Sequence, residues 1–331
     1  MTNFQALRDG AALRDEAALR DGAALRDEAV ASALELANGG RWERALALLD
    51  AMDRDVPSAL AAAEVALDQD WWAGTDTAGE RLAEAERAGA HGWALDFLRL
   101  RHDYLRLIHP AGETFQPGPW GKDPEAIAAI ERQGELLRRT APGRIEAGWA
   151  EMYLGLIADN VRADREAAPP HYEAALAASG KDAPAASAGG KVSGGAASGG
   201  AASGGVASGG VASSGVASGG VASGGDALLA REALRHLGDH DHDRGDHALA
   251  LDRWRRATAL GAGAGRVTGT LSQQLLLAVL ARDAGDEAGA VALATEIERW
   301  ADALGATRIR DNATAFLAGV DPTAAPEDAA S

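Results

Sequence analysis

The stretch GDALLAREALRHLGDHDHDRGDHALALDRWRRATALG, residues 225–261, decides the fold because its apolar residues fall at the spacing of two helices joined by a short turn. If Gly245 is the turn, the small and large apolar positions around it are Leu237, Gly238, Ala250, Trp254 and Ala257. Small residues at Gly238 and Ala250 let two helices approach closely, and Trp254 fills the space beside them. The stretch therefore predicts an antiparallel helix pair.

The same spacing recurs elsewhere in the chain. Around Gly40 it gives Ala33, Leu36, Trp42, Ala45, Leu49, Met52 and Pro57. Around Gly285 it gives Leu277, Ala278, Ala281, Ala290, Ala294 and Ile297. A fourth, looser copy runs from Leu154 and Gly155 to Tyr172 and Ala175, and we expect Pro169 and Pro170 to distort its turn. Recurrence at several places indicates a repeat architecture.

This repeat resembles the tetratricopeptide repeat (TPR) family over roughly two thirds of the chain. The chain looks similar to degenerate TPR-only proteins of high-GC bacteria, since only Lys122, Lys181 and Lys191 among its 32 basic residues are lysine. The resemblance implies an all-α fold, a TPR-like α-solenoid of antiparallel helix pairs. Strand-like alternation is absent from the sequence, which agrees with that fold class.

Composition divides the chain into five segments. We expect a hexad-repeat extension at 1–29, a TPR-like helical region at 30–182, a disordered AASGG/VASGG insertion at 183–225, C-terminal TPR repeats with a capping helix at 226–320, and a disordered tail at 321–331. Leucines six residues apart step by about 240° around a helix, so the hexads form no apolar stripe and predict a solvated extension or a partner-binding arm. The insertion either hinges two halves or joins neighbouring repeats that remain stacked.

The net charge limits the classes of partner. A formal charge of -17 and a pI near 4.9 oppose direct binding to nucleic acid or to an anionic membrane, which both require a basic surface. The chain has no cysteine, no secretory signal pattern and no apolar run near the roughly 20 residues needed to cross a bilayer. We therefore expect a cytoplasmic protein.

The TPR resemblance also implies which side chains line a concave groove. These are Val30, Leu34, Ala37 and Asn38 in the first repeat, Arg235, Asp239, His242 and Asp243 near Gly245, and Leu275, Val279, Arg282 and Asp283 in the last repeat. Val30 and Leu34 replace the lysine and asparagine of the family's carboxylate clamp, so an amphipathic helix or an apolar extended segment is the expected ligand. The alternative is that the capping helix or another subunit covers these residues.

The run HDHDRGDH, residues 240–247, is the one candidate for metal chemistry. His236, His240 and Asp243 share a helix face, with His247 just beyond the turn, and imidazole with carboxylate suits zinc or nickel. The alternative is a solvated polar helix end, and we expect no cofactor. Asp241 occupies a position that the family fills with an apolar side chain, so we expect Arg244 or a histidine to pair with it.

Three functional classes remain open. The first is a non-catalytic scaffold or adaptor that binds a protein or peptide in the groove. The second is a detached sensor-type helical domain of a transcriptional-regulation system, which would bind a small ligand or a regulatory protein. The third is a metal-dependent enzyme centred on residues 236–247. The sequence contains no phosphate-binding loop or nucleophile motif that favours catalysis.

Overall fold

The computed structural model describes residues 22–110, 115–181 and 226–320, and every regular element within these ranges is helical. Residues 22–38 form the first helix. The helices that follow are α2 (Trp42–Asp50), α3 (Val56–Ala73), α4 (Ala78–Arg87), α5 (Trp93–Ile108), α6 (Pro124–Thr140), α7 (Arg144–Leu156), the π-helical turn η1 (Ile157–Val161), α8 (Ala168–Ser179), α9 (Ala227–Asp243), α10 (His247–Gly263), α11 (Val267–Asp283), α12 (Glu287–Leu304) and α13 (Thr307–Leu317). The all-α prediction is confirmed for this part of the chain.

Glycines end several helices where the sequence predicts turns. Gly40, Gly245 and Gly285 have φ of 73°, 81° and 85°, a region of backbone conformation that other residues rarely adopt. Asp246 and Asp286 then begin α10 and α12, because their carboxylates accept hydrogen bonds from backbone amides in the first turn. Local chemistry therefore sets each of these boundaries.

The predicted close approach of α9 and α10 occurs at Gly238. A Cβ on Gly238 would lie 2.4 Å from Nε1 of Trp254, so only glycine leaves room for the indole. Gly155 makes the same kind of contact with Tyr172, where a Cβ would lie 2.5 Å from Cε1. In these two copies the large residue thus packs on a glycine of the preceding helix.

The turn of the fourth copy differs from the prediction. Pro169 and Pro170 lie in the first turn of α8, where a missing N–H is tolerated, and they start the helix rather than distort a turn. The irregularity is η1, in which the end of α7 widens into a π-helix. This widening brings Asp159 and Asn160 inside, and both are buried.

At the start of α4, Thr77 and Glu80 have the spacing of a capping box but do not form one. The Thr77 side chain makes no capping hydrogen bond. Instead, the Asp70 carboxylate accepts from the amides of Thr77 and Ala78 at 2.9 and 2.8 Å. A side chain at the end of α3 therefore provides the cap.

The helices on either side of residues 182–225 pack directly against each other. The Asp226 amide donates to the Ser179 carbonyl at 2.9 Å, and Trp149 Nε1 donates to the Asp226 carboxylate at 2.9 Å. Of the two arrangements considered for the insertion, the described residues show the stacked one. The insertion itself, the tail 321–331 and most of the hexad extension lie outside the described residues. The final hexad, residues 24–29, continues into the first helix, with Leu25 67% exposed.

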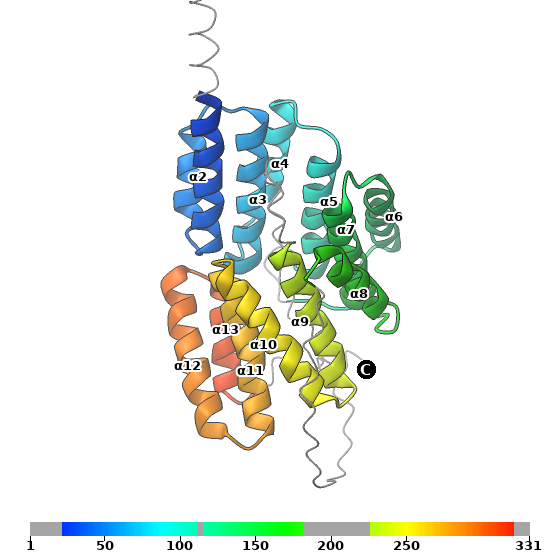
Figure 1. Cartoon of the computed structure of the whole chain (residues 1–331), viewed down its shortest axis with the longest axis vertical. Helices are drawn as coiled ribbons and strands as arrows, with labels where there is room; N and C mark the ends of the chain where they lie inside the picture. Colours follow the sequence, from blue (N-terminus) through cyan, green and yellow to red (C-terminus); the bar gives the residue numbers. More distant parts are fainter. Residues whose placement is uncertain (1–21, 111–114, 182–225, 321–331) are drawn as a thin grey trace, which may run out of the picture.

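The last helix returns to the N-terminal half. Figure 1 shows α12 and α13 below α2 and α3. Thr307 donates to the Ala73 carbonyl at 3.0 Å, and Arg308 donates to the Trp71 carbonyl at 2.7 Å. α13, predicted as a cap from Thr307 to Leu317, therefore satisfies carbonyls at the C-terminal end of α3.

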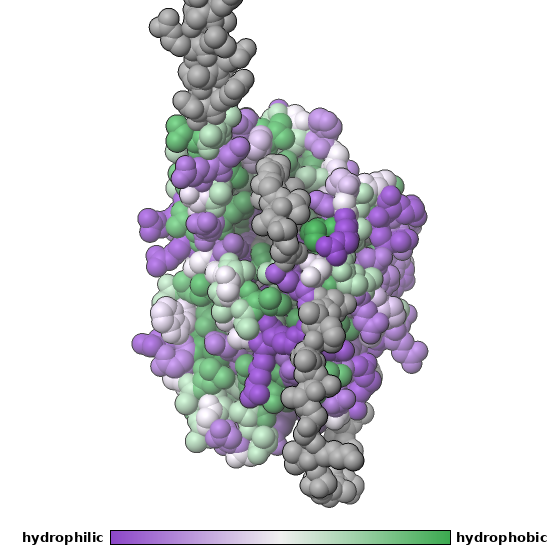
Figure 2. Space-filling view, in the orientation of Figure 1, coloured by the Kyte–Doolittle hydropathy of each residue, from purple (hydrophilic) through white to green (hydrophobic). Residues whose placement is uncertain are grey.

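None of the helices in the described part of the chain combines the length and the apolar character that a membrane crossing requires. The face in Figure 2 mixes polar and apolar side chains, and hydrophilic ones predominate over α6. The exposed large apolar side chains on α10 and α12 are Leu249, Val291 and Trp300.

Candidate functional site: an inner polar cluster

Buried polar side chains gather where α3, α5, η1, α8, α9 and α11 meet, and we call them the inner polar cluster. Its buried members are Glu64, Asp68, Arg101, Asp159, Tyr172, Arg231, Glu232, Arg235, His236, His240, Arg266 and Gln273, and the partly buried Asp239 lies among them. Charged residues are almost never fully buried unless they are paired. A buried set of this size is therefore the strongest candidate for a functional site among the described residues.

One end of the cluster joins α3 to α5 and to the start of α11. Arg101 lies 3.5 Å from both the Glu64 and Asp68 carboxylates, and Arg266 makes a two-point ion pair with Asp68. Burial raises the pKa of Glu64 to about 7, which outweighs the lowering effect of Arg101. Glu64 is therefore only partly ionised at neutral pH.

The other end surrounds Asp159 of η1. Its carboxylate accepts from Arg165 at 2.9 Å and from the Tyr172 hydroxyl at 3.1 Å, and the His240 imidazole lies 3.1 Å away. Arg165 also pairs with Asp243. These contacts join α9, which follows the insertion, to η1 and α8, which precede it.

Arg231 of α9 lies between these two ends in space made by glycines. A Cβ on Gly269 would lie 2.7 Å from its guanidinium, and one on Gly261 would lie 3.3 Å from Nε. Arg231 pairs with Glu232 and donates to the Gly269 carbonyl. Gly261 of α10 and Gly269 of α11 therefore leave room for the Arg231 guanidinium in the protein interior.

Several buried polar atoms of the cluster have no hydrogen-bond partner. They are Arg231 Nε, Glu232 Oε2, His236 Nδ1, Asp239 Oδ2 and both amide atoms of Gln273. Buried polar groups are hydrogen-bonded in the large majority of cases, and leaving one unpaired costs about 1–3 kcal/mol. Burial raises the pKa of Asp239 to about 6 and holds the pKa of His236 well below its usual value. The cluster thus has unused hydrogen-bonding capacity.

The groove residues predicted in the first repeat lie beside this cluster. Leu34, Ala37 and Asn38 line a cavity of about 30 Å³ together with Glu64 and Asp68. The Asn38 side-chain oxygen accepts from Arg266 at 2.9 Å. Val30 is partly buried and packs on the apolar core.

The predicted groove residues of the middle repeat divide between two environments. Arg235 is fully buried, with Nη1 3.0 Å from Nε2 of His236, and Asp239 accepts from Trp254 at 3.0 Å. His242 lies away from them at the end of α9, beside His247.

The predicted groove residues of the last repeat do not join the cluster. Leu275 and Val279 are 5% and 2% exposed and belong to the apolar core. The Arg282 guanidinium stacks 3.6 Å above the Phe316 ring of α13. The capping helix therefore covers Arg282, as in the alternative that the sequence left open.

The four candidate metal ligands do not converge. His240 pairs with Asp159, Asp243 pairs with Arg165, and the His236 ring stacks on Tyr172 at 5.0 Å. His247 lies with its Nδ1 3.0 Å from that of His242. Across residues 22–110, 115–181 and 226–320, no group of three or more His, Cys, Asp or Glu side chains is arranged to hold a metal ion.

Sequence reasoning found one partner of Asp241 and missed another. Arg244 pairs with the buried Asp241 carboxylate as expected, and Arg253 of α10 lies 2.9 Å from it. Most of the inner polar cluster was also missed, including Arg231, Arg266 and Gln273. The available signal was charge on α9 and at Arg266, at positions that face neighbouring helices.

Comparison with known proteins found no family model and no curated protein that matches this chain. The candidate site therefore depends on geometry alone.

Proposed function

We propose that this chain is a non-catalytic, TPR-like α-solenoid that binds a segment of a protein partner through the inner polar cluster. The observation that carries the proposal is Gln273, which is fully buried and has neither amide atom paired. A primary amide offers one acceptor and two donors, which complement the N–H and C=O of a peptide backbone. Because Gln273 is 0% exposed, a bound peptide segment would satisfy both of its amide atoms only after the helices that cover it move apart.

The polar lining favours a polar, extended partner segment over the amphipathic helix or apolar extended segment that the sequence suggested. Leu275 and Val279, the apolar part of the predicted groove, are already packed in the core. What lies inside instead are arginines and carboxylates, which select a ligand by hydrogen bonds and charge. We expect this interaction to occur in the cytoplasm and to place the protein among scaffolds or adaptors.

The second candidate, a sensor-type domain that binds a small ligand, would use the same cluster. It is favoured by the complete burial of His236 and Gln273, because enclosure suits a small molecule better than a long peptide. Both candidates require Gln273 to bond with the ligand, so the nature of the ligand distinguishes them.

Selection from a displayed random-peptide library tests the proposal, with Gln273→Met as the diagnostic variant and Gln274→Met as the matched control. Methionine keeps the length of the side chain and removes both amide atoms. Because those atoms are unpaired in the free protein, Gln273→Met should fold with equal or higher stability. Gln274 is the next residue on α11 and is only partly buried.

We expect selected peptides to bind the wild type and Gln274→Met equally, and Gln273→Met about tenfold or more weakly, as measured by fluorescence anisotropy. Peptides that bind all three proteins equally would remove Gln273 from the site. If no peptide is enriched but polar metabolites raise the melting temperature of the wild type and not of Gln273→Met, the sensor candidate replaces the first.

A further inference from the structure

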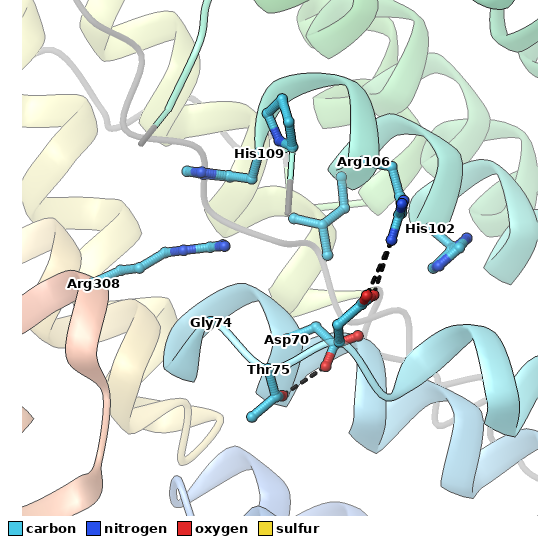
Figure 3. A pocket seen from close by; sticks show the side chains of 10 residues that line it. Asp70, Gly74, Thr75, His102, Arg106, His109 and Arg308 are labelled. Carbon is cyan, nitrogen blue, oxygen red and sulfur yellow. Dashed lines mark hydrogen bonds and ion pairs between the residues drawn. The ribbon is translucent and has the colours of Figure 1, made fainter. Parts of the chain in front are cut away.

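A second polar cavity lies at the junction of α5, the α3–α4 loop and α13, away from the inner polar cluster. It measures about 70 Å³ and is lined by Asp70, Gly74, Thr75, Asp76, His102, Leu105, Arg106, His109, Pro110 and Arg308. Figure 3 shows the Arg308 guanidinium reaching from α13 toward the side of the cavity where His109 lies. Residues more than 230 positions apart in the chain therefore meet here.

Arg308 makes no ion pair in the described part of the chain, although the Asp70 carboxylate is near enough to raise its pKa. Its one hydrogen bond there goes from Nη1 to the Trp71 carbonyl, and no carboxylate among the described residues lies within 4 Å of it. Partial burial lowers the pKa of Arg308 to about 10 and outweighs the raising effect of the Asp70 carboxylate, so the group keeps its charge at neutral pH. A partly buried guanidinium with free donors favours a counter-anion.

The carboxylates that line the cavity are already occupied. Asp70 accepts from the Thr75 hydroxyl and from the backbone amides of Thr77 and Ala78. Asp76 pairs with Arg106 at 3.0 Å. Neither carboxylate forms an ion pair with Arg308, and both accept hydrogen bonds from other groups.

His109 adds a second unused group. Its Nδ1 is buried without a hydrogen-bond partner, and its ring meets Trp71 edge to face at 5.4 Å. Burial, with a smaller effect from nearby Arg308, lowers the pKa of His109 to about 3, so the imidazole is neutral at physiological pH. A neutral imidazole can donate one N–H to an anion without needing a counter-charge.

We propose that this cavity binds a small tetrahedral oxyanion, phosphate or sulfate, held by the guanidinium of Arg308 and the imidazole of His109. A planar guanidinium suits the two-point recognition of such an anion. The cavity is large enough for such an anion. One water molecule needs roughly 10–15 Å³ of cavity volume, so a cavity of 70 Å³ holds about five non-hydrogen atoms, the number in phosphate or sulfate. A bound anion would also strengthen the contact of α13 with α3 and α5.

Isothermal titration calorimetry on the full chain tests this site at constant ionic strength, with chloride as the balancing anion. The probes are inorganic phosphate, sulfate, acetate and O-phosphoserine; the last shows whether a phosphoryl group on a larger molecule also enters. The diagnostic variant is Arg308→Gln. The control is Arg310→Gln, which removes a solvent-exposed arginine of the same helix that pairs with Asp302 and Asp311.

We expect saturable 1:1 binding of phosphate or sulfate, weakened about tenfold or more in Arg308→Gln and unchanged in Arg310→Gln. Binding of O-phosphoserine would assign the site to phosphorylated molecules, and its exclusion would assign it to the free ion. Phosphate heats no larger than those of acetate, or equal affinity in Arg308→Gln, would overturn the proposal.

A second variant keeps the proposal testable if Arg308→Gln does not fold. Arg308→Lys retains the charge and loses the planar fork, so phosphate affinity should fall by at least about threefold. Phosphate should also raise the pKa of His109, seen by NMR as a shift of its ring signals in the wild type. Undiminished affinity in Arg308→Lys together with an unmoved His109 signal would overturn the site.

Discussion

Arg266 and Asp68 form a buried two-point ion pair across 198 residues of the chain, with Nη1 2.5 Å from Oδ2 and Nη2 3.0 Å from Oδ1. The side chains are 1% and 2% exposed. Arg266 begins α11, and Asp68 lies inside α3, so the pair joins the C-terminal helices to the N-terminal half at a point distinct from the contact of α13. Arg101 shares the Asp68 carboxylate.

Asp68→Asn should be strongly destabilising. It leaves Arg266 and Arg101 buried with one carboxylate fewer between them, and removing one partner of a buried pair costs about 3–5 kcal/mol. Urea unfolding measures the change in the free energy of unfolding. The control is Glu296→Gln, which breaks the exposed pair with Arg299 and should cost under about 1 kcal/mol. Equal effects of the two substitutions would contradict the assigned role of the buried pair.

Glu64 should make stability depend on pH. The charged groups that face it are Arg101, Asp68 and Arg266, and its pKa is raised from 4.5 to about 7 in the folded state. Because the folded chain holds this proton more tightly than the unfolded chain, Glu64 contributes stability below about pH 4.5 that is lost as the pH rises through about 7.

Glu64→Gln should remove that dependence. A rise in pKa of this size corresponds to about 3 kcal/mol, so between pH 4.5 and 8 the wild type should lose about that much stability relative to the variant. Urea unfolding across this range, with the two proteins compared at each pH, gives the difference. A difference that does not vary with pH would show that Glu64 titrates normally.

Two glycine-to-alanine substitutions should have opposite effects. Gly238→Ala places a methyl group 2.4 Å from the Trp254 indole nitrogen, and this overpacking should cost about 1–3 kcal/mol. Gly263→Ala, at the end of α10, meets nothing within 4 Å and should stabilise the protein by up to about 1 kcal/mol through helix propensity. Thermal unfolding by circular dichroism compares them; a stabilising Gly238→Ala would refute the close contact.

Replacing residues 182–225 by a short Gly-Ser linker should preserve the fold. The Asp226 amide already lies 2.9 Å from the Ser179 carbonyl, so a few residues can join Lys181 to Asp226. Shortening the connection from 44 to about five residues spans about three doublings and should stabilise the protein by about 2 kcal/mol. Loss of helical signal or of stability would show that the replaced residues contribute to the folded core.

Local patterns in the sequence agree with the structure where the pattern allows a single arrangement. Trp93, Phe97 and Tyr104 lie on one face of α5, and their aromatic rings pack inward as the helical spacing predicts. Asp123 caps α6 ahead of Pro124 for the same local reason. In contrast, the cap of α4 comes from Asp70, seven residues before Thr77, because the carboxylate reaches across a loop whose path the sequence does not specify.

The candidate site was harder to predict because helical spacing says which residues share a face, but not what covers that face. Leu275 and Val279 share the expected face of α11, yet neighbouring helices bury them in the apolar core. No pattern in the sequence predicts that Arg231 and Gln273 are buried. They are buried only because Gly261 and Gly269 on neighbouring helices leave room for Arg231, and because α11 packs with Gln273 inside.

The sequence by itself determined the helices and the turns between them, since apolar spacing, glycines of positive φ and aspartate caps act within a few residues. Only the tertiary structure decided that α13 returns to α3, that Arg266 meets Asp68, and that a polar cavity forms beside Arg308. These contacts join residues about 200 or more positions apart. They depend on the accumulated angles between many packed helices, a quantity that no short stretch of sequence contains.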